Sequence, residues 1–474
     1  MVTQGVDHYR QDLRRAIGLI GNTSITLSFL TPTASLFLTA SVLLTLNGSA
    51  TFLSFVFAGV AALGMALCFA EMGSAFPVVG GQYSIVMRVL GRPLGFLAFV
   101  LFVVLGIFTI SATSLVVGIY LQVIWPDANS ALVGSLMIAG ATLVGVFGIR
   151  FNAVVTGLFL LLELIVVLIV SVTGLVHVHQ PVSTLFDLRS FDAKGNPIAI
   201  GFGGMVAGIA IAMFAYNGYD TAIVFSEETQ GRRTMIARAV LTSFFIALVA
   251  EVVAVTATLL GASSLVKEFN SSAPISYMLT ANGGTTLNTL VSLGVALAIF
   301  NADIAAVLAI GRVIYSSARD RAWPDVINRW VGDVHPRLKT PWIATTILGV
   351  ACTVLTAASN IATLVTFVGV VLIVLYAMVA ISAFVSRFTQ RNIERPFKMP
   401  FWPLPIVIAL VGIGMALSQQ KVADLVIVAG ILLASAIYYV AYLQPRSSTH
   451  WLKLDPLPME ETAPVARVAP VPTV

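Results

Sequence analysis

Apolar stretches long enough to cross a lipid bilayer recur along this chain of 474 residues, with short polar segments between them. A spanning helix needs ~20 mostly apolar residues, because each residue adds ~1.5 Å and the hydrocarbon layer is ~30 Å thick. Only 10% of the residues are charged and 58% are hydrophobic, which a water-soluble domain of this size could not bury. The sequence therefore predicts an all-α membrane protein of about twelve transmembrane helices. These spans begin near residues 17, 51, 93, 130, 152, 197, 237, 286, 341, 361, 402 and 423.

The distribution of basic residues predicts the orientation of the chain. With the N-terminus in the cytoplasm, 22 of the 26 Lys and Arg residues fall on the inner side, and the four outside are Arg189, Lys194, Lys267 and Lys421. This is the bias that the positive-inside rule requires. We expect an integral multi-pass protein of the plasma or inner membrane, with both termini cytoplasmic. Because the positive charge follows the loops, the net charge of +5 does not indicate a nucleic-acid partner.

Two of the apolar segments are interrupted near their middles by residues that helices avoid. The first runs from about Ile17 to Leu46 and is broken by TPTAS at residues 31–35, and the second runs from about Pro197 to Ser226 and is broken by YNGYD at residues 216–220. In hydrocarbon, a broken helix persists only where protein, water or ligand satisfies the freed peptide groups. Discontinuous helices at matching places in two halves of a chain are typical of the binding site of an inverted-repeat transporter.

The matching breaks divide the chain into two repeats. Residues 1–16 are expected to form a cytoplasmic N-terminus, residues 17–178 a first repeat of five spans, and residues 197–385 a second. Residues 402–443 supply two further spans, and residues 444–474 are expected to be a disordered cytoplasmic tail. An odd number of spans per repeat inverts the second repeat relative to the first, and spans one and six are the discontinuous helices.

The two breaks offer binding groups of opposite character. Half-helix N-termini present free amides that suit a carboxylate, whereas freed carbonyl groups suit a cation. We expect the first break to hold a substrate carboxylate, the second to hold an amine, and Tyr216 to cover the substrate as an inner gate. The residues expected to bind substrate are Thr31, Thr33, Ala34, Ser35, Ala215, Tyr216, Asn217, Gly218 and, from span eight, Asn301.

Four carboxyl groups lie deep inside predicted spans, with no Lys or Arg at comparable depth: Glu163, Asp220, Glu251 and Asp303. An ionised group there costs ~2.5–3.5 kcal/mol on insertion scales, so each must face a cavity, find a partner or hold a proton. We expect Asp220, which follows the break at Gly218, to couple protons to transport, together with Glu163 and Asp303. The structural alternative is a protonated acid hydrogen-bonded to a neighbouring helix. The excess of buried acid also favours a cationic or amine-bearing substrate.

Five stretches resemble segments of the amino acid/polyamine/organocation (APC) permeases, in the order found in that family. They are AEMGSAFPVVGGQY (70–83), FAYNGYDTA (214–222), SEETQ (226–230), GRVIYSSARDRAWP (311–324) and RPFKMP (395–400). The resemblance implies a LeuT-type fold with a five-plus-five inverted repeat and alternating access. Substrates in the family include amino acids, polyamines and related amines. Two departures stand out: TPTAS replaces the Gly-rich first break of many members, and Glu163 lies on the fifth span, where some proton-coupled members carry a Lys.

These patterns together predict a secondary active transporter that imports an amino acid or organic amine with protons, sodium being the alternative coupling ion. An exchanger has the same architecture, whereas a transporter-like nutrient sensor would need an extended signalling domain. An enzyme is disfavoured, because none of the five His residues lies deep in a span and no nucleophile, metal-ligand or phosphate-loop pattern appears. We expect no catalytic residue, cofactor or metal. The sequence leaves open which amine is carried and the oligomeric state.

Overall fold

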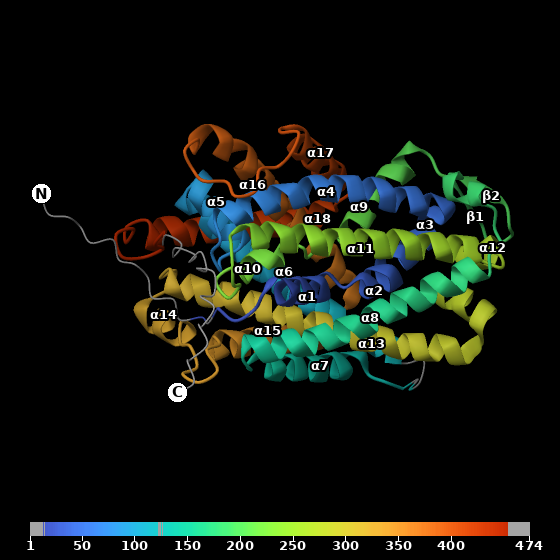
Figure 1. Ribbon diagram of the computed structural model, residues 1–474, viewed down its shortest axis with the longest axis horizontal. Coiled ribbons are helices and arrows are strands. Elements are labelled where there is room, and N and C mark those ends of the chain that lie inside the picture. Colours follow the sequence, from blue (N-terminus) through green and yellow to red (C-terminus); the bar gives the residue numbers. More distant parts are fainter. Residues whose placement is uncertain (1–12, 14, 122–124, 126, 454–474) are drawn as a thin grey trace, which may run out of the picture.

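The computed structural model describes residues 13, 15–121, 125 and 127–453 and is an elongated bundle of helices (Figure 1). The helices of the first half are α1 (Leu19–Leu30), α2 (Pro32–Ala34), α3 (Ser41–Asn47), α4 (Thr51–Ala75), α5 (Gln82–Leu90), α6 (Arg92–Leu121), α7 (Ser130–Gly145) and α8 (Ile149–Val176). Those of the second half are α9 (Phe202–Ala215), α10 (Thr221–Val224), α11 (Thr234–Gly261), α12 (Leu265–Phe269), α13 (Pro274–Arg319), α14 (Asp325–Val331), α15 (Trp342–Ala358), α16 (Ile361–Thr389), α17 (Leu404–Ser418) and α18 (Val422–Tyr438). Two short antiparallel strands, β1 (Arg189–Phe191) and β2 (Pro197–Ala199), pair in the register Ser190 to Ile198.

Seven segments of the described chain are long and apolar enough to cross a membrane. They are Leu19–Ala75, Arg92–Gly118, Ile149–Val176, Thr234–Gly261, Pro274–Arg319, Phe367–Thr389 and Val422–Leu443. Four further apolar helices, α7, α9, α15 and α17, have 14 to 17 residues. The all-α membrane class predicted from the sequence is confirmed, while the count of about twelve spans and the two repeats stay predictions.

The longest of these segments, Leu19–Ala75, reverses direction at Gly48. Figure 1 shows α3 running toward the end of the bundle that carries β1 and β2, and α4 leading away from it. Gly48 has φ +52°, and a Cβ there would lie 2.5 Å from the carbonyl oxygen of Arg189. Only glycine fits this turn, because both the backbone angle and the approach of the strand exclude a side chain.

The first broken helix lies in the middle of the bundle. α1 packs against α8, α11 and α13, and α9 packs against α4, α17 and the π-helical turn Ser35–Ala40 that follows α2. The long helix α13 also packs against α6, and it is kinked at Gly284 (φ +80°). These neighbours determine which side chains can reach the two breaks.

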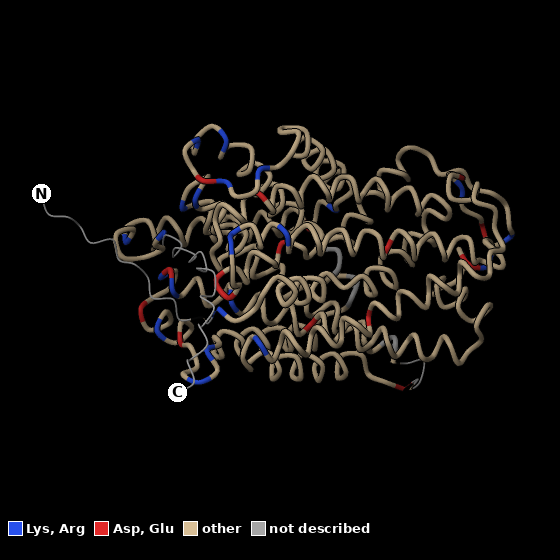
Figure 2. Tube along the Cα trace, in the orientation of Figure 1, with Lys and Arg blue, Asp and Glu red and all other residues tan. Residues whose placement is uncertain are grey.

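Charge is distributed unevenly along the bundle. Figure 2 shows most Lys and Arg residues at the end that carries α5 and α14, and far fewer at the end that carries β1, β2 and α12. Ion pairs occur at the charged end, among them a pair between Arg312 and Glu228 whose side chains are both fully buried. The first end is called the charged end below, and the other the strand end.

Residues 444–453, which we expected to begin a disordered tail, pack against the charged end instead. The indole of Trp451 is buried and donates a hydrogen bond of 2.9 Å to the carbonyl oxygen of Arg92. Its ring lies 5.4 Å from those of Tyr83 and Phe96, measured between centroids. A large aromatic ring gains enough from such burial to hold a short segment in place. The remainder of the expected tail, and most of the expected N-terminal segment, lie outside the described residues.

Candidate substrate site at the two helix breaks

The first break lies at Thr31, between α1 and α2. Thr31 adopts a left-handed conformation (φ +49°), which is rare for a β-branched residue and ends α1. Pro32 begins α2 and has no amide proton to continue the hydrogen-bonding pattern of α1. The helix is therefore interrupted where the sequence predicted it.

The second break lies between Ala215, the last residue of α9, and Thr221, the first of α10. Gly218 has φ +123°, and a Cβ at this position would lie 2.9 Å from the Cα and 3.0 Å from the amide nitrogen of Leu30. The two breaks therefore touch, backbone against backbone. Glycine is required because any side chain at 218 would push the end of α1 away.

A cavity of about 150 Å³ lies between the breaks. Its walls come from α1 to the π-helical turn, α6, the second break, α13 and α16, and are formed by Phe29, Leu30, Thr31, Ala34, Ser35, Leu38, Thr39, Thr109, Ala112, Thr113, Phe214, Asn217, Ala302, Asp303, Ala306 and Val368. Apolar walls with a few polar groups are typical of small-molecule sites. Five of the expected site residues line the cavity: Thr31, Ala34, Ser35, Asn217 and Asp303.

Two of the groups expected to face substrate are occupied by protein partners in this conformation. The amide of Thr33 donates to the Glu163 carboxylate at 3.1 Å, and its hydroxyl donates to the carbonyl oxygen of Glu163 at 3.2 Å. The carbonyl oxygen of Ala215 accepts a hydrogen bond of 2.8 Å from the hydroxyl of Ser35. Thr33 thus anchors the first break to α8, and the Ser35 bond ties the two breaks together.

Tyr216 does not cover the cavity, contrary to the expected role as an inner gate. Its ring is buried edge-to-face against Phe55 and Phe244, at 6.0 Å from each, and its hydroxyl donates to the carbonyl oxygen of Phe55 at 3.1 Å. The side chain therefore points toward α4 and α11. The turn between α9 and Gly218 directs Asn217, the next residue, to the cavity instead.

Asn301 is also turned away from the cavity wall. Its amide donates to the hydroxyl of Ser28 at 2.9 Å and to the carbonyl oxygen of Thr156 at 3.3 Å. Asn301 thereby joins α13 to α1 and α8, while the next two residues, Ala302 and Asp303, line the cavity.

The three carboxyl groups expected to carry protons occupy three different places. Glu163 lies behind the first break and accepts from the hydroxyl of Thr31 at 2.8 Å in addition to the amide of Thr33. Asp220 lies behind the second break and accepts from the amide of Gln82 and, at 2.9 Å, from the hydroxyl of Tyr376. Asp303 lies in the cavity wall. All three are buried.

Residues that the sequence did not single out complete these contacts. The Tyr376 hydroxyl also lies 2.8 Å from the side-chain oxygen of Asn217, so it connects Asp220 to a cavity residue. Gln82 belongs to a stretch that resembles the APC signature, but the pattern attaches no role to it. Tyr376 lies in a continuous apolar helix without a local signal, and the same holds for Thr109 and Thr113 on α6.

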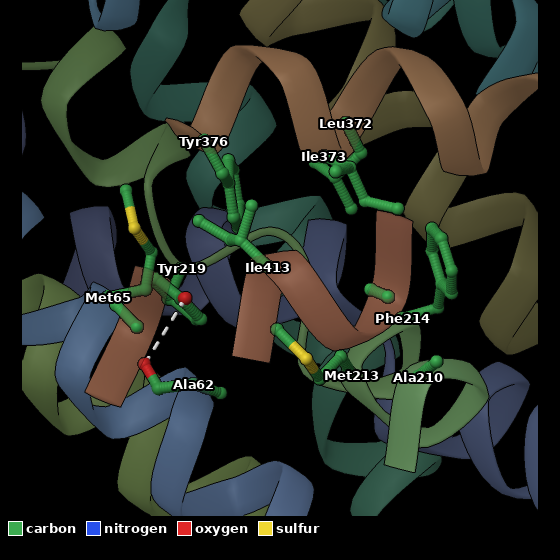
Figure 3. Close-up of a pocket in the computed structure, with 12 residues that line it drawn as sticks. Ala62, Met65, Ala210, Met213, Phe214, Tyr219, Leu372, Ile373, Tyr376 and Ile413 are labelled. Atoms are coloured by element: carbon green, nitrogen blue, oxygen red, sulfur yellow. Dashed lines mark hydrogen bonds between the residues drawn. The ribbon is translucent and has the colours of Figure 1, made fainter. Parts of the chain in front are cut away.

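A separate apolar pocket adjoins the second break (Figure 3). Met65, Met213, Tyr219, Tyr376 and Ile413 are among its walls. The hydroxyl of Tyr219 donates to the carbonyl oxygen of Ala62 at 3.3 Å, which fixes the ring against α4. The pocket encloses only about 20 Å³, so this side of the break is close-packed.

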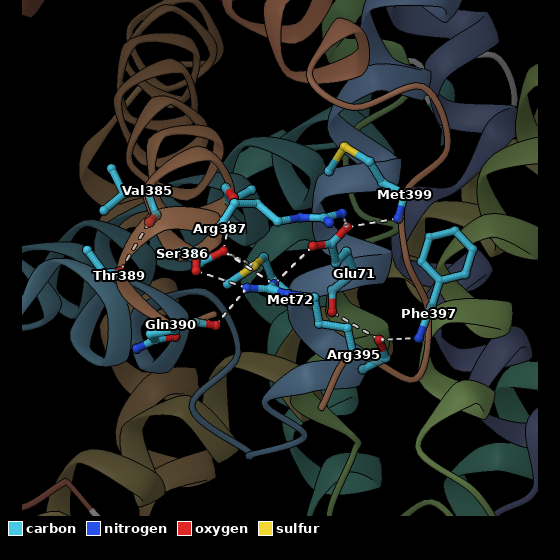
Figure 4. A network of polar contacts seen from close by, with 12 residues as sticks. Glu71, Met72, Val385, Ser386, Arg387, Thr389, Gln390, Arg395, Phe397 and Met399 are labelled. Carbon is cyan, nitrogen blue, oxygen red and sulfur yellow. Dashed lines mark hydrogen bonds and ion pairs between the residues drawn. The ribbon is translucent and has the colours of Figure 1, made fainter. Parts of the chain in front are cut away.

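Polar networks close the bundle at the charged end. The carboxylate of Glu71, near the end of α4, accepts hydrogen bonds from the side chains of Arg387 at 2.6 Å and Arg395 at 3.0 Å (Figure 4). It also accepts one from the backbone amide of Met399 at 2.8 Å. This holds the loop after α16 against α4, so Glu71 is a structural carboxylate. The buried pair of Arg312 and Glu228 similarly fixes α13 to the segment that follows α10.

A bundle of apolar helices, in which two broken helices enclose a small cavity with a few polar groups in apolar walls, is typical of a membrane transporter. The chain belongs to the amino acid permease family, whose model matches residues 12–442. It is 24% identical to the methylthioribose transporter of Bacillus subtilis (strain 168) over 91% of this chain and 94% of the relative. It is 23% identical to the branched-chain amino acid permease BcaP of the same organism, over 83% of this chain and 85% of the relative. It is 24% identical to the serine/threonine exchanger SteT of that organism, over 77% of this chain and 82% of the relative. The chain is therefore a transporter rather than an enzyme.

Proposed function

We propose that this protein is a secondary active transporter of an amino acid or organic amine, that it works by alternating access, and that it imports its substrate with protons. The observation that carries the proposal is the cavity between the two broken helices, where hydroxyl, amide and carboxylate groups interrupt apolar walls. Two of the relatives are named for amino acids, which supports that substrate class. The third is named for methylthioribose, so membership of the family does not by itself select a substrate.

The proposed architecture has about twelve spans, arranged as two inverted repeats of five and two further helices. The segment Leu19–Ala75 counts as two spans, because it reverses at Gly48, and with the other long segments and the four shorter helices the total reaches twelve. The excess of Lys and Arg at the charged end supports placing that end in the cytoplasm, with both termini (Figure 2).

In this conformation access to the cavity is proposed to come from the strand end. Leu38 lines the cavity and also a second pocket of about 250 Å³, which extends to Ser272 and Ser276 near the start of α13. At the charged end, the buried pair of Arg312 and Glu228 closes the opposite route. Alternating access would require this pair to separate, and breaking a buried ion pair costs about 3–5 kcal/mol unless other partners replace it.

Proton coupling is assigned to the carboxyl groups that lie behind the breaks. Asp220 is connected through Tyr376 to Asn217, so a proton on Asp220 would change the contacts of a cavity residue. The Glu163 carboxyl group accepts from Thr31 and Thr33, so a proton there would weaken the hold of α8 on the first break. Asp303 is the third expected proton carrier. A sodium ion remains the alternative coupling ion, and exchange without net coupling is the alternative mode, which the name of SteT favours.

The test uses purified protein in liposomes. Counterflow of labelled amino acids, polyamines and choline-like compounds identifies the substrate, and uptake is then measured with and without an inward proton gradient. We expect Asp220→Asn to keep counterflow and lose gradient-driven accumulation, whereas Glu268→Gln, a buried carboxyl outside the cavity, serves as the matched control. Counterflow that the gradient does not change would establish an exchanger instead. No counterflow with any compound would overturn the proposed function.

A further inference from the structure

We propose that Asp303 binds the end of the substrate side chain, and that the preferred substrate is an amino acid whose side chain carries a second positive charge at its end. The inference rests on the proposed function and makes its substrate class more specific. It departs from the expectation that Asp303 carries the coupling proton.

Within the described part of the chain, the cavity has a single ionisable wall residue. Among these lining residues Asp303 is the only Asp, Glu, Lys, Arg or His, and the remaining polar groups are hydroxyls and the amide of Asn217. Asp303 is on α13, whereas the breaks contribute the side chains of Thr31, Ser35 and Asn217. The cavity therefore has neutral binding groups at the breaks and one acidic group on a different element, α13.

Two hydroxyl groups contact the Asp303 carboxyl group, one at each of its oxygens. Thr113 and Ser114, consecutive residues of α6, each lie 2.6 Å from one of its oxygens. The Thr113 oxygen also lies 3.0 Å from the carbonyl oxygen of Thr109 and 3.1 Å from that of Ile110, so the contact with Asp303 is its shortest. Distances of about 2.5–2.7 Å are those expected when a hydroxyl donates to an ionised carboxylate. When both hydroxyls donate to it, Asp303 presents an anion in the cavity wall.

A negative charge in an apolar site is costly unless a positive group neutralises it. No Lys or Arg of the described chain lines this cavity, so no wall side chain neutralises Asp303, and a cationic group of the ligand can do so. Thr109, four residues before Thr113 on α6, also lines the cavity, and its buried hydroxyl has no hydrogen-bond partner among the described residues. An ammonium group has three donors. It can give one to Asp303 and others to the hydroxyl oxygens of Thr109 and Thr113.

The other two acids that were expected to carry protons have a different environment. Glu163 and Asp220 are bound by protein donors behind the breaks and do not line the cavity. Replacing a residue that carries the coupling proton should change the transport of all substrates alike. A residue that contacts the side chain should change the ratio between a charged and an uncharged substrate.

L-Ornithine and L-norleucine separate these roles, because their side chains have the same number of non-hydrogen atoms and differ in the terminal charge. We would measure the affinity of the detergent-purified full chain for both by ligand-induced thermal stabilisation, and confirm it by counterflow in liposomes. Wild type should bind ornithine more tightly. Asp303→Asn keeps partners for Thr113 and Ser114, and it should lower ornithine affinity at least about tenfold without weakening norleucine. Glu268→Gln, the same chemical change outside the cavity, should leave both affinities unchanged.

Three outcomes would overturn the inference. Equal losses for both ligands in Asp303→Asn would make the residue a coupling or structural group, and no loss for either ligand would exclude contact with the side chain. In both cases amino acid transport itself would stand. Binding of neither compound by wild type, with no counterflow of any amino acid, would reject the proposed function together with the inference. If Asp303→Asn elutes as an aggregate, Thr109→Val takes its place, with an expected loss of about threefold to tenfold for ornithine alone.

Discussion

Gly218 allows a direct test of the contact between the two breaks. Replacing it by Ala adds a Cβ that would lie 2.9 Å from the Leu30 Cα, at a backbone angle of φ +123°. The left-handed angle costs an L-residue about 1–2 kcal/mol, and the overlap with the backbone of Leu30 adds about 1–3 kcal/mol. We therefore expect Gly218→Ala to destabilise the protein by about 2–5 kcal/mol, and to weaken substrate binding because the end of α1 is displaced.

Two other glycines separate the contributions. Gly284 has φ +80°, and a Cβ added there would meet nothing within 4 Å, so Gly284→Ala carries the angular cost alone, about 1–2 kcal/mol. Gly430, inside α18, has neither a strained angle nor a neighbour, and Gly430→Ala should stabilise the helix by up to about 1 kcal/mol. Thermal unfolding followed by thiol-reactive dye would use the buried Cys68 and Cys352 as reporters. A Gly218 variant as stable as the Gly284 variant would refute the contact with Leu30.

Three further expectations concern the ends of the bundle. Arg312→Met should destabilise by about 3–5 kcal/mol, and adding Glu228→Met should recover most of this, as judged by thermal unfolding of the single and double variants. Burial raises the pKa of the Glu268 carboxyl well above its ordinary value of 4.5. The contribution of this group to stability is therefore present below pH 4.5 and is lost as the pH rises. Glu268→Gln should be more stable than wild type at neutral pH, and the difference should vanish in unfolding curves at about pH 4. Trp451→Ala should destabilise by about 3–5 kcal/mol through loss of its ring contacts, while Ser447→Ala, at an exposed neighbouring position, should change the midpoint little.

The breaks could be predicted from the sequence because their cause is local. Pro32 lacks an amide proton, and Gly218 accepts a backbone angle that other residues resist. Each residue therefore predicts a helix interruption without reference to its neighbours in space. The buried acids could be found for a similar reason, since a carboxyl group inside an apolar run is visible in the sequence. The positions of Asp220 and Glu163 beside the breaks agree with that reasoning.

The direction of the side chains could not be predicted in the same way. Tyr216 and Asn217 are adjacent, and only the path of the chain after α9 decides which of them reaches the cavity. Tyr376 is one aromatic residue in an apolar helix, and its contact with Asp220 depends on how α16 packs, 156 residues away along the chain. Likewise, the amide of Thr33 is free in an isolated half-helix and is occupied only because α8 brings Glu163 to it.

The close approach of Leu30 and Gly218 also limits how this sequence can change over evolutionary time. The backbone of one break fills the space that a side chain on the other would need, and Ser35 and Ala215 share a hydrogen bond beside it. A substitution that bends either segment is therefore transmitted to its counterpart before any ligand is involved. The two halves of the chain are free to drift apart at their surfaces, but at this junction they can only change as a pair.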